Sequence, residues 1–250
     1  TNLAGAPTAY RMMMAAEPEK MATLKGKFRV VSSAGEPLNP EVIRWFEQVL
    51  DAPIFDHYGQ TEVGMVVCNH HALSHLVHAG SAGFASPGYR IAVLDEQGNE
   101  QPADTSGILA VDISQSPMMW FSGYVESRKS PFLKHYYLTG DTAEIHEDGS
   151  MSFVGRSDDV ITTSGYRVGP FDVESALLEH DAVIEAAVVG VPDPERTEII
   201  KAFVILSNHA TASKALEDEL SQFVKKRLSA HAYPRLVEFV SELPKTPSGK

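Results

Sequence analysis

The stretch Phe153-Val-Gly-Arg-Ser-Asp-Asp-Val-Ile-Thr-Thr-Ser-Gly-Tyr-Arg-Val-Gly169 separates two differently patterned parts of the chain. It places two arginines, two adjacent aspartates and three glycines between short apolar runs. Glycine adopts backbone angles that other residues avoid, and it lets a ligand come close to the main chain. Taken alone, the stretch is more typical of a surface hairpin with ordinary turn chemistry. The sequence on either side has to decide between these interpretations.

The composition is typical of a globular protein that does not bind polyanions. Apolar residues make up 43% of the 250 residues and charged residues 22%, which is the usual balance for a folded protein. The net charge of −12 disfavours general binding to nucleic acid or to a membrane surface, because phosphates would be repelled. No apolar run approaches the roughly 18–20 residues that span a bilayer, and the first residues lack the pattern of a signal peptide.

The chain contains a single cysteine, Cys68, and this count indicates the cellular compartment in which the protein works. One cysteine excludes an internal disulfide and suits a reducing cytosol. Cys68 is either a small buried thiol, which is the commoner role, or a catalytic one. We therefore expect a cytoplasmic protein without a nucleic-acid partner and without stable membrane insertion.

The part before the opening stretch alternates strands and helices. Residues 28–33 read as a buried strand, Asn39 and Pro40 as the cap and first residue of a helix, and residues 52–55 as the next strand. The polar heptad Asp56–Glu62 follows this strand, and ligands collect at the carboxyl ends of strands in open α/β sheets. From Gly83 on, short strands and turns predominate, with a helix expected near Lys129–Lys134.

The part after the opening stretch has helices and strands enough for a core of its own. A long amphipathic helix over Ser213–Ala230 lies between two apolar strand runs and a last strand. We predict the fold class α/β plus α+β, with residues 1–157 forming an α/β layer and a β-rich subdomain. Residues 158–250 are predicted to form a small α+β domain.

Three histidines offer a metal hypothesis. His71, His75 and His78 recur at helical spacing, which suits metal ligation. There is no second thiol, no nearby carboxylate ligand and no HExxH pattern. A polar loop or helix face explains them better, so we set a metal aside.

Six motifs in sequence order resemble those of the adenylate-forming enzymes, the superfamily of acyl-CoA synthetases, luciferases and the adenylation domains of peptide synthetases. They are Ala34-Gly-Glu-Pro-Leu38, Tyr58-Gly-Gln-Thr-Glu62, Tyr137-Leu-Thr-Gly-Asp141, Gly155-Arg-Ser-Asp-Asp159, Gly165-Tyr-Arg167 and Pro244-Lys-Thr-Pro-Ser-Gly-Lys250. Each motif alone is weak, but their order and approximate spacing make a chance match very improbable.

The resemblance implies a domain plan. Residues 1–157 would be the C-terminal part of the large AMP-binding domain, and residues 158–250 the small mobile lid domain, with a hinge at Asp158. The Ser/Thr/Gly-rich phosphate loop of the family, which binds anions through backbone amides, is absent from this sequence. The chain therefore resembles the C-terminal half of such an enzyme. We expect its partner to be the missing N-terminal half, and we expect the segment alone to be inactive.

The resemblance also implies a nucleotide site. Gly35, Glu36 and Pro37 would lie along the adenine, and Asp56 would accept a hydrogen bond from its amino group. The motif containing Tyr58, Gly59 and Gln60 would place the aromatic ring on the base.

The phosphate and ribose contacts follow from the same motifs. Asp141 would accept the ribose hydroxyls, supported by Arg156. Thr61 would bind phosphate, and Glu62 would help to hold Mg²⁺, which prefers carboxylate and phosphate oxygens. Lys250 resembles the catalytic lysine, whose ammonium group would neutralise charge at the α-phosphate. Lys250, Thr61 and Glu62 are therefore the predicted catalytic residues.

The resemblance places the second, thiol-transfer step on the small domain. Gly165 matches the glycine that lines the pantetheine tunnel, and Arg167 is placed to meet phosphate. Lys225, with Lys226 and Arg227, forms a basic cluster suited to a CoA phosphate. An ordinary solvated helix end, favoured by the helix dipole, explains this cluster at least as well.

The resemblance gives less direct information on the length of the acyl chain. Acetyl- and propionyl-CoA synthetases typically have a tryptophan where this chain has Gly59, so glycine would leave room for a longer chain. Val63, Gly64 and Met65 would supply an apolar lining. The surrounding sequence, from Phe121–Tyr124 through Ala232–Arg235, most resembles medium-chain acyl-CoA synthetases.

The predicted function is that of an AMP-forming acid–thiol ligase that uses ATP, Mg²⁺ and CoA. A carboxylic acid, here a medium-chain fatty acid, would become an acyl-adenylate and then an acyl-CoA. One alternative is an adenylation domain that loads the phosphopantetheine of a carrier protein. Another is a non-catalytic nucleotide-binding fragment.

Overall fold

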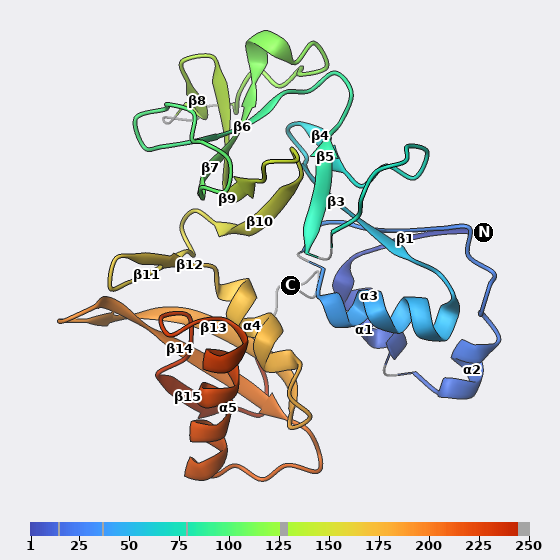
Figure 1. Ribbon diagram of the computed structural model, residues 1–250, viewed down its shortest axis with the longest axis vertical. Coiled ribbons are helices and arrows are strands. Elements are labelled where there is room, and N and C mark those ends of the chain that lie inside the picture. The colour runs from blue at the N-terminus through green and yellow to red at the C-terminus, as the bar shows by residue number, and fades with distance from the viewer. Residues whose placement is uncertain (15, 37, 79, 126–129, 245–250) are drawn as a thin grey trace. The chain divides into compact units, whose positions relative to one another are not determined.

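The chain folds into two compact units. The computed structural model describes residues 1–14, 16–36, 38–78, 80–125 and 130–244. The first unit is Thr1–Phe153 and the second begins at Val154, so the division falls inside the opening stretch, close to the boundary expected after residue 157. Each unit contains its own sheet (Figure 1), and the predicted class, α/β plus α+β, is confirmed.

The first unit combines short helices with a long sheet. Its helical segments and strands are α1 (Pro7–Met14), α2 (Pro18–Ala22), α3 (Pro40–Trp45), the π-helical turn η1 (Phe46–Leu50), the 3₁₀ turn η2 (Ile113–Gln115), β1 (Asn2–Gly5), β2 (Val30–Ser33), β3 (Ile54–Gln60), β4 (Gly64–Cys68), β5 (Ser81–Ala85), β6 (Ile91–Leu94), β7 (Gly107–Asp112), β8 (Phe132–Leu133), β9 (Tyr136–Ile145) and β10 (Met151–Arg156). No described helix is long and apolar enough to cross a membrane.

The strand order in this sheet is β1-β2-β3-β4-β5-β10-β9-β7-β6, with β8 paired to β9. The strands β1, β2 and β3 are parallel, whereas β3 and β4 form an antiparallel hairpin. Strand β3 thus pairs with β2 through Asp56 and with β4 from His57 onward. The predicted strand ended at Phe55, so most of the polar heptad lies in the strand itself.

Local signals explain the helix between β2 and β3. The Asn39 side chain accepts a hydrogen bond from the Glu41 amide at 2.8 Å, and Pro40 occupies the first helical position, as predicted. A buried cluster that includes Tyr10, Val42 and Phe46 joins α1, α3 and η1 to β2 and β3.

A second cluster fills the β-rich part of this unit. Val66, Leu109 and Met151 are fully buried in it. The helix expected near Lys129–Lys134 was wrong for the described residues, because Phe132 lies in strand β8 and contacts the rings of Phe121 and Tyr137. Residues 126–129 lie outside the described part of the chain.

The second unit is a small α+β fold. Its elements are β11 (Ile161–Thr163), β12 (Tyr166–Val168), α4 (Pro170–Leu178), β13 (Val183–Asp193), β14 (Thr197–Leu206), α5 (Lys214–Arg227) and β15 (Leu236–Phe239). The strand order is β12-β11-β14-β13, and β15 pairs in parallel with β14.

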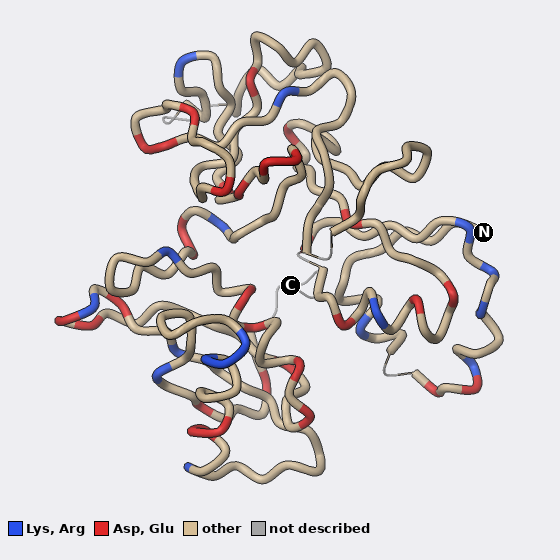
Figure 2. The backbone as a smooth tube through the Cα atoms, viewed as in Figure 1, with Lys and Arg blue, Asp and Glu red and all other residues tan. Residues whose placement is uncertain are grey.

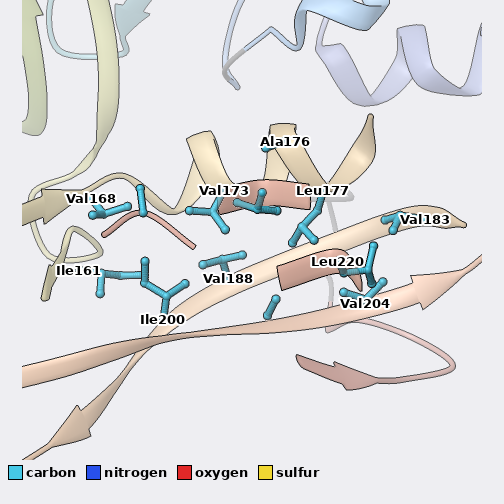
Figure 3. Packing of buried hydrophobic residues seen from close by; sticks show 13 residues of the cluster. Ile161, Val168, Val173, Ala176, Leu177, Val183, Val188, Ile200, Val204 and Leu220 are labelled. Carbon is cyan, nitrogen blue, oxygen red and sulfur yellow. The ribbon is translucent and has the colours of Figure 1, made fainter. Parts of the chain in front are cut away.

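One apolar core holds this second unit together. Val173 and Leu177 from α4, Ile200 from β14, and Leu220 and Val224 from α5 are almost completely buried. Figure 3 shows this packing between the helices and the sheet. Because each helix buries one apolar stripe on the sheet, the predicted amphipathic pattern of α5 is confirmed.

The start of β14 contains an unusual backbone angle. Thr197 has a φ of +71°, in the left-handed region where an L side chain costs about 1–2 kcal/mol. Glycine lacks that cost but loses about 0.5–1 kcal/mol through the entropy of the unfolded chain. We expect Thr197→Gly to raise the free energy of unfolding by roughly 0.5–1 kcal/mol. Urea denaturation measures this change.

Thr197→Val is the matched control, because valine keeps the branched Cβ in the same backbone conformation. The strain would not be real if Thr197→Gly were less stable than the wild-type chain.

Candidate functional site

The predicted adenine residues meet at the carboxyl end of β2. Ser33, the last residue of β2, is paired with Asp56 on β3, and Gly35 follows in the loop with a φ of +93°. Glu36 is anchored by Thr8, whose hydroxyl donates to Glu36 Oε2 at 2.7 Å, and by Arg11 at 3.5 Å. Pro37 lies outside the described residues. The loop and Asp56 therefore form one polar edge.

Asp56 is the most perturbed carboxyl group at this edge. Burial raises its pKa from 3.8 to about 7, and the backbone amide of His57 only partly opposes this shift. Asp56 Oδ1 is buried and accepts no hydrogen bond from the described residues. A buried acceptor without a donor is costly, so this oxygen is suited to receive a donor from a ligand.

Tyr58 and Gln60 converge on Asp141. The Tyr58 hydroxyl donates to Asp141 Oδ2 at 2.5 Å, and Gln60 Nε2 donates to the same oxygen at 2.7 Å. Gln60 Nε2 also donates to the carbonyl of Thr139 at 2.9 Å, and Gln60 Oε1 accepts from the Tyr137 hydroxyl at 3.2 Å. Segments about 80 residues apart in the sequence are joined here.

This network refines two predicted nucleotide contacts. Both polar ends of the Gln60 side chain are bound to protein groups, so in this structure Gln60 orients Asp141. Burial, and next the charge of Asp141, raise the pKa of the Tyr58 hydroxyl, which therefore stays a donor. The Tyr58 ring lies 6.1 Å from the Phe153 ring at an interplanar angle of 28°, so one stacking partner comes from the protein itself.

Thr61 and Glu62 lie in the turn between β3 and β4. Thr61 is exposed, and Glu62 Oε1 accepts from the Tyr124 hydroxyl at 2.8 Å. An accessible hydroxyl next to a carboxylate fits a site for Mg²⁺ and phosphate, since magnesium takes few protein ligands and keeps phosphate oxygens. Sequence reasoning missed Tyr124 as a partner of Glu62, because 62 residues separate the two.

The predicted acyl lining is not assembled as expected. A Cβ on Gly59 would lie 2.2 Å from the Gly64 carbonyl oxygen, so the absence of a side chain is required by the close β3–β4 hairpin. The role of Gly59 in leaving room for a longer acyl chain stays a prediction. Val63 is 4% exposed and packs into the β-rich core, whereas Met65 is 52% exposed and Gly64 is also exposed.

The predicted hinge and thiol residues lie in the second unit. The Arg156 Nε atom is 3.3 Å from Asp158 Oδ1, and both side chains are largely exposed. Ser164 and Gly165 have φ angles of +50° and +83° in the tight turn of the β11–β12 hairpin. Apart from Gly165 and its two chain neighbours, no atom of the described chain lies within 4 Å of a Cβ built on Gly165, so this side of the turn is open within the described chain.

The basic residues in the last turn of α5 (Figure 2) divide between different partners. Lys225 Nζ is 5.1 Å from the centre of the Tyr233 ring, and the Arg235 guanidinium is 4.9 Å from the same ring. Arg227 pairs with Glu179. Lys225 and Arg235 therefore bring two cations together around one ring. Lys250 lies outside the described residues.

The three histidines have separate partners. His71 Nε2 is 3.2 Å from Ser32 Oγ, His75 Nε2 accepts from the His70 amide at 3.0 Å, and His78 Nε2 is 3.0 Å from Asp148.

A different group has the geometry to hold a metal. The ligand atoms of Asp104, Glu144 and His146 lie within 4.8 Å of one another. His146 already has a partner at each ring nitrogen, Asp104 at 2.9 Å and Ser152 at 2.8 Å. The group is explained without an ion.

Comparison with known proteins links both units to one family. Residues 1–125 match the profile described as AMP-binding enzyme, and residues 172–250 match that of the AMP-binding enzyme C-terminal domain. The acetyl-coenzyme A synthetase of Bacillus subtilis is 47% identical over 251 residues, which cover 98% of this chain and 43% of the relative. The 4-hydroxybutyrate–CoA ligase 1 of Metallosphaera sedula is 45% identical over 254 residues, which cover 100% of this chain and 44% of the relative.

A solved structure gives the same result. The acyl-CoA synthetase of Brucella canis is 65% identical, with a TM-score of 0.64 over 99% of this chain and 46% of that chain. The chain thus spans less than half the length of the relatives it matches.

The raised pKa of Asp56 has a consequence for stability. The folded chain keeps a proton on Asp56 up to about pH 7, whereas the unfolded chain releases it near pH 3.8. Asp56 therefore lowers stability progressively as the pH rises between these values, and the loss is complete above about pH 7. Asp56→Asn does not ionise, so this variant should lose less stability than the wild-type chain between about pH 5 and 8 in urea denaturation.

Asp181→Asn, which removes an exposed carboxylate, controls for the loss of one negative charge. Identical pH dependence in the wild-type chain and Asp56→Asn would contradict the assignment.

Proposed function

The chain belongs to the AMP-binding enzyme family, and from this premise we propose that it forms the C-terminal half of an ATP-dependent acyl-CoA synthetase. In the first step the carboxylate of an acid attacks the α-phosphorus of ATP, which gives an acyl-adenylate and pyrophosphate. In the second step the thiol of CoA attacks the acyl carbon, which gives acyl-CoA, AMP and a proton. The observation that supports this most is the buried Asp141 carboxylate held by Tyr58 and Gln60.

Each residue at this edge has a task that suits its chemistry. Asp56 Oδ1 would accept the adenine amino hydrogen, which supplies the donor that this buried oxygen lacks among the described residues. Asp141 would accept the ribose hydroxyls, and Gln60 and Tyr58 would hold it in place. Gly35 would let the base approach the backbone. These contacts bind and orient the nucleotide without a proton transfer.

The phosphate end would be held by Thr61 and Glu62, together with Lys250, whereas Arg156 would support the ribose. Mg²⁺ would neutralise phosphate charge when bound. Glu62 is a suitable ligand for Mg²⁺, because it lies in a turn next to the exposed Thr61. The Tyr124 hydroxyl donates to Glu62 Oε1 and would orient the carboxylate. The Lys250 ammonium group would balance the negative charge that develops during attack.

The second unit would supply the thiol step. The open side of Gly165 suits the passage of a narrow pantetheine chain. Lys225 would add positive charge for a CoA phosphate, together with Arg167. Asp158, in the exposed turn after β10, would be the hinge that allows the two steps to alternate.

A medium-chain fatty acid remains the proposed substrate. Relatives named for acetyl-CoA and for 4-hydroxybutyrate–CoA synthesis are almost equally similar to this chain, so overall similarity does not select the acid. With Gly59 required by the hairpin, the proposal rests on the exposed apolar side chain of Met65. Each added methylene of a buried acyl chain would contribute about 0.8 kcal/mol.

Pyrophosphate exchange by the full-length enzyme tests the reaction and the acid together. Across straight-chain acids from acetate to dodecanoate, exchange should be greatest for medium-length acids and should require Mg²⁺. The 250-residue chain alone should form no acyl-adenylate, because the phosphate-loop motif is absent from it. Exchange confined to amino acids would favour the carrier-protein alternative, and binding of AMP without any exchange would favour a non-catalytic module.

The hinge assignment has its own test. Asp158→Pro locks φ near −65°, so in the full-length enzyme it should slow thioester formation by about tenfold or more, while acyl-adenylate formation changes less. Asp158→Ala, which keeps backbone freedom, is the control. Single-turnover assays of each step give the comparison, and normal thioester formation by Asp158→Pro would show that Asp158 is not the hinge.

A further inference from the structure

A carboxylate holds the β11–β12 hairpin in place. Glu198 Oε2 accepts a hydrogen bond from the Thr162 amide at 2.7 Å. Thr162 lies in β11 and Glu198 in β14, so the contact joins neighbouring strands of the second unit. In a regular sheet the Thr162 amide would donate to a backbone carbonyl of the next strand. Here it donates to the Glu198 carboxylate.

The pairing of the two strands explains why a side chain is needed. The only register pair between described residues of β11 and β14 is Thr163 with Thr197. The next antiparallel pair would be Thr162 with Glu198, but the ladder between β11 and β14 does not extend to it. Thr197, the β14 residue at which this pairing stops, has the left-handed φ of +71°. The Glu198 side chain therefore connects β14 to β11 at a position where the two backbones do not pair.

Strand β13 leaves space for this carboxylate at Gly190. A Cβ built on Gly190 would lie 2.7 Å from Glu198 Oε1 and 3.1 Å from Oε2. Gly190 does not have a left-handed φ, so the backbone does not require glycine there. The space is required by the position of the Glu198 carboxylate.

The hairpin that Glu198 holds bears the proposed thiol residues. Thr162 is directly opposite Arg167, and the turn between them contains Gly165. Arg196 fastens the same turn, because its carbonyl accepts from the Ser164 amide at 2.9 Å and its guanidinium donates to Ser164 Oγ at 3.0 Å. Glu198 and Arg196 thus brace the hairpin from one end of β14.

We propose that Glu198 is a positioning residue for the thiol-transfer step, acting through Thr162 to set the placement of Gly165 and Arg167. This inference rests on the proposed function. Glu198 touches neither the thiol nor the acyl-adenylate in this assignment. Its effect should therefore appear in the use of CoA and not in adenylate formation.

The test compares both half-reactions in the full-length enzyme. Glu198→Ala should lower kcat/KM for CoA by about tenfold or more, the loss expected when a hydrogen bond to a charged group is removed. Pyrophosphate exchange should stay within about twofold of the wild-type enzyme. Glu198→Gln, whose amide oxygen still accepts from Thr162, should recover most of the CoA activity.

A second variant leaves Glu198 itself unchanged. Gly190→Ala places a methyl group against the end of the Glu198 side chain, which can swing away without disturbing the backbone. It should reproduce the CoA defect of Glu198→Ala. Glu195→Ala removes an exposed carboxylate in the turn between β13 and β14; it is the matched control and should behave as the wild-type enzyme.

Amide hydrogen exchange of residues 161–168 reports the contact independently of catalysis, and it should accelerate in Glu198→Ala and Gly190→Ala. Unchanged CoA kinetics in both variants, or an equal loss in both half-reactions, would overturn the positioning role. A wild-type enzyme without pyrophosphate exchange would overturn the proposed function, whereas unchanged hydrogen exchange would overturn the contact itself.

Discussion

The first unit depends on the double pairing of strand β3. Its first residues complete a parallel layer with β2, and its later residues form an antiparallel hairpin with β4. Because successive side chains of a strand point to opposite faces, Asp56, Tyr58 and Gln60 lie on one face. The strand therefore presents a buried carboxyl group, a phenol and an amide in a row where the two kinds of sheet meet.

The polar residues on this face cost stability unless they find partners. Asp141 receives two donors, from Tyr58 and Gln60, and Thr139 donates its hydroxyl to the carbonyl of Leu109 in the next strand. Asp56 Oδ1 is one of the buried polar atoms that have no hydrogen-bond partner among the described residues. A fold that satisfies the Asp141 carboxylate and leaves one oxygen of Asp56 without a donor is suited to binding a ligand with both donors and acceptors, as a nucleotide has.

In the second unit, a few side-chain contacts attach the β11–β12 hairpin to the rest of the fold. An apolar core of two helices on a small sheet supports a short hairpin that has few ladder bonds of its own. Two side chains at the start of β14 and in the turn before it complete the attachment, namely the Glu198 carboxylate and the Arg196 guanidinium. The turn that contains Gly165 can thus be open to a ligand and still be held in position.

The sequence by itself determined the features that rest on local chemistry. The Asn39-Pro40 start of α3, the amphipathic stripe of α5 and the motifs shared with the AMP-binding enzymes were all readable from neighbouring residues. Only the tertiary structure decided that β3 changes partners at His57, that Gly59 is required by the hairpin, and that Gln60 holds Asp141. These depend on strand pairing and on contacts between residues about 80 positions apart, for which a single sequence contains no local signal.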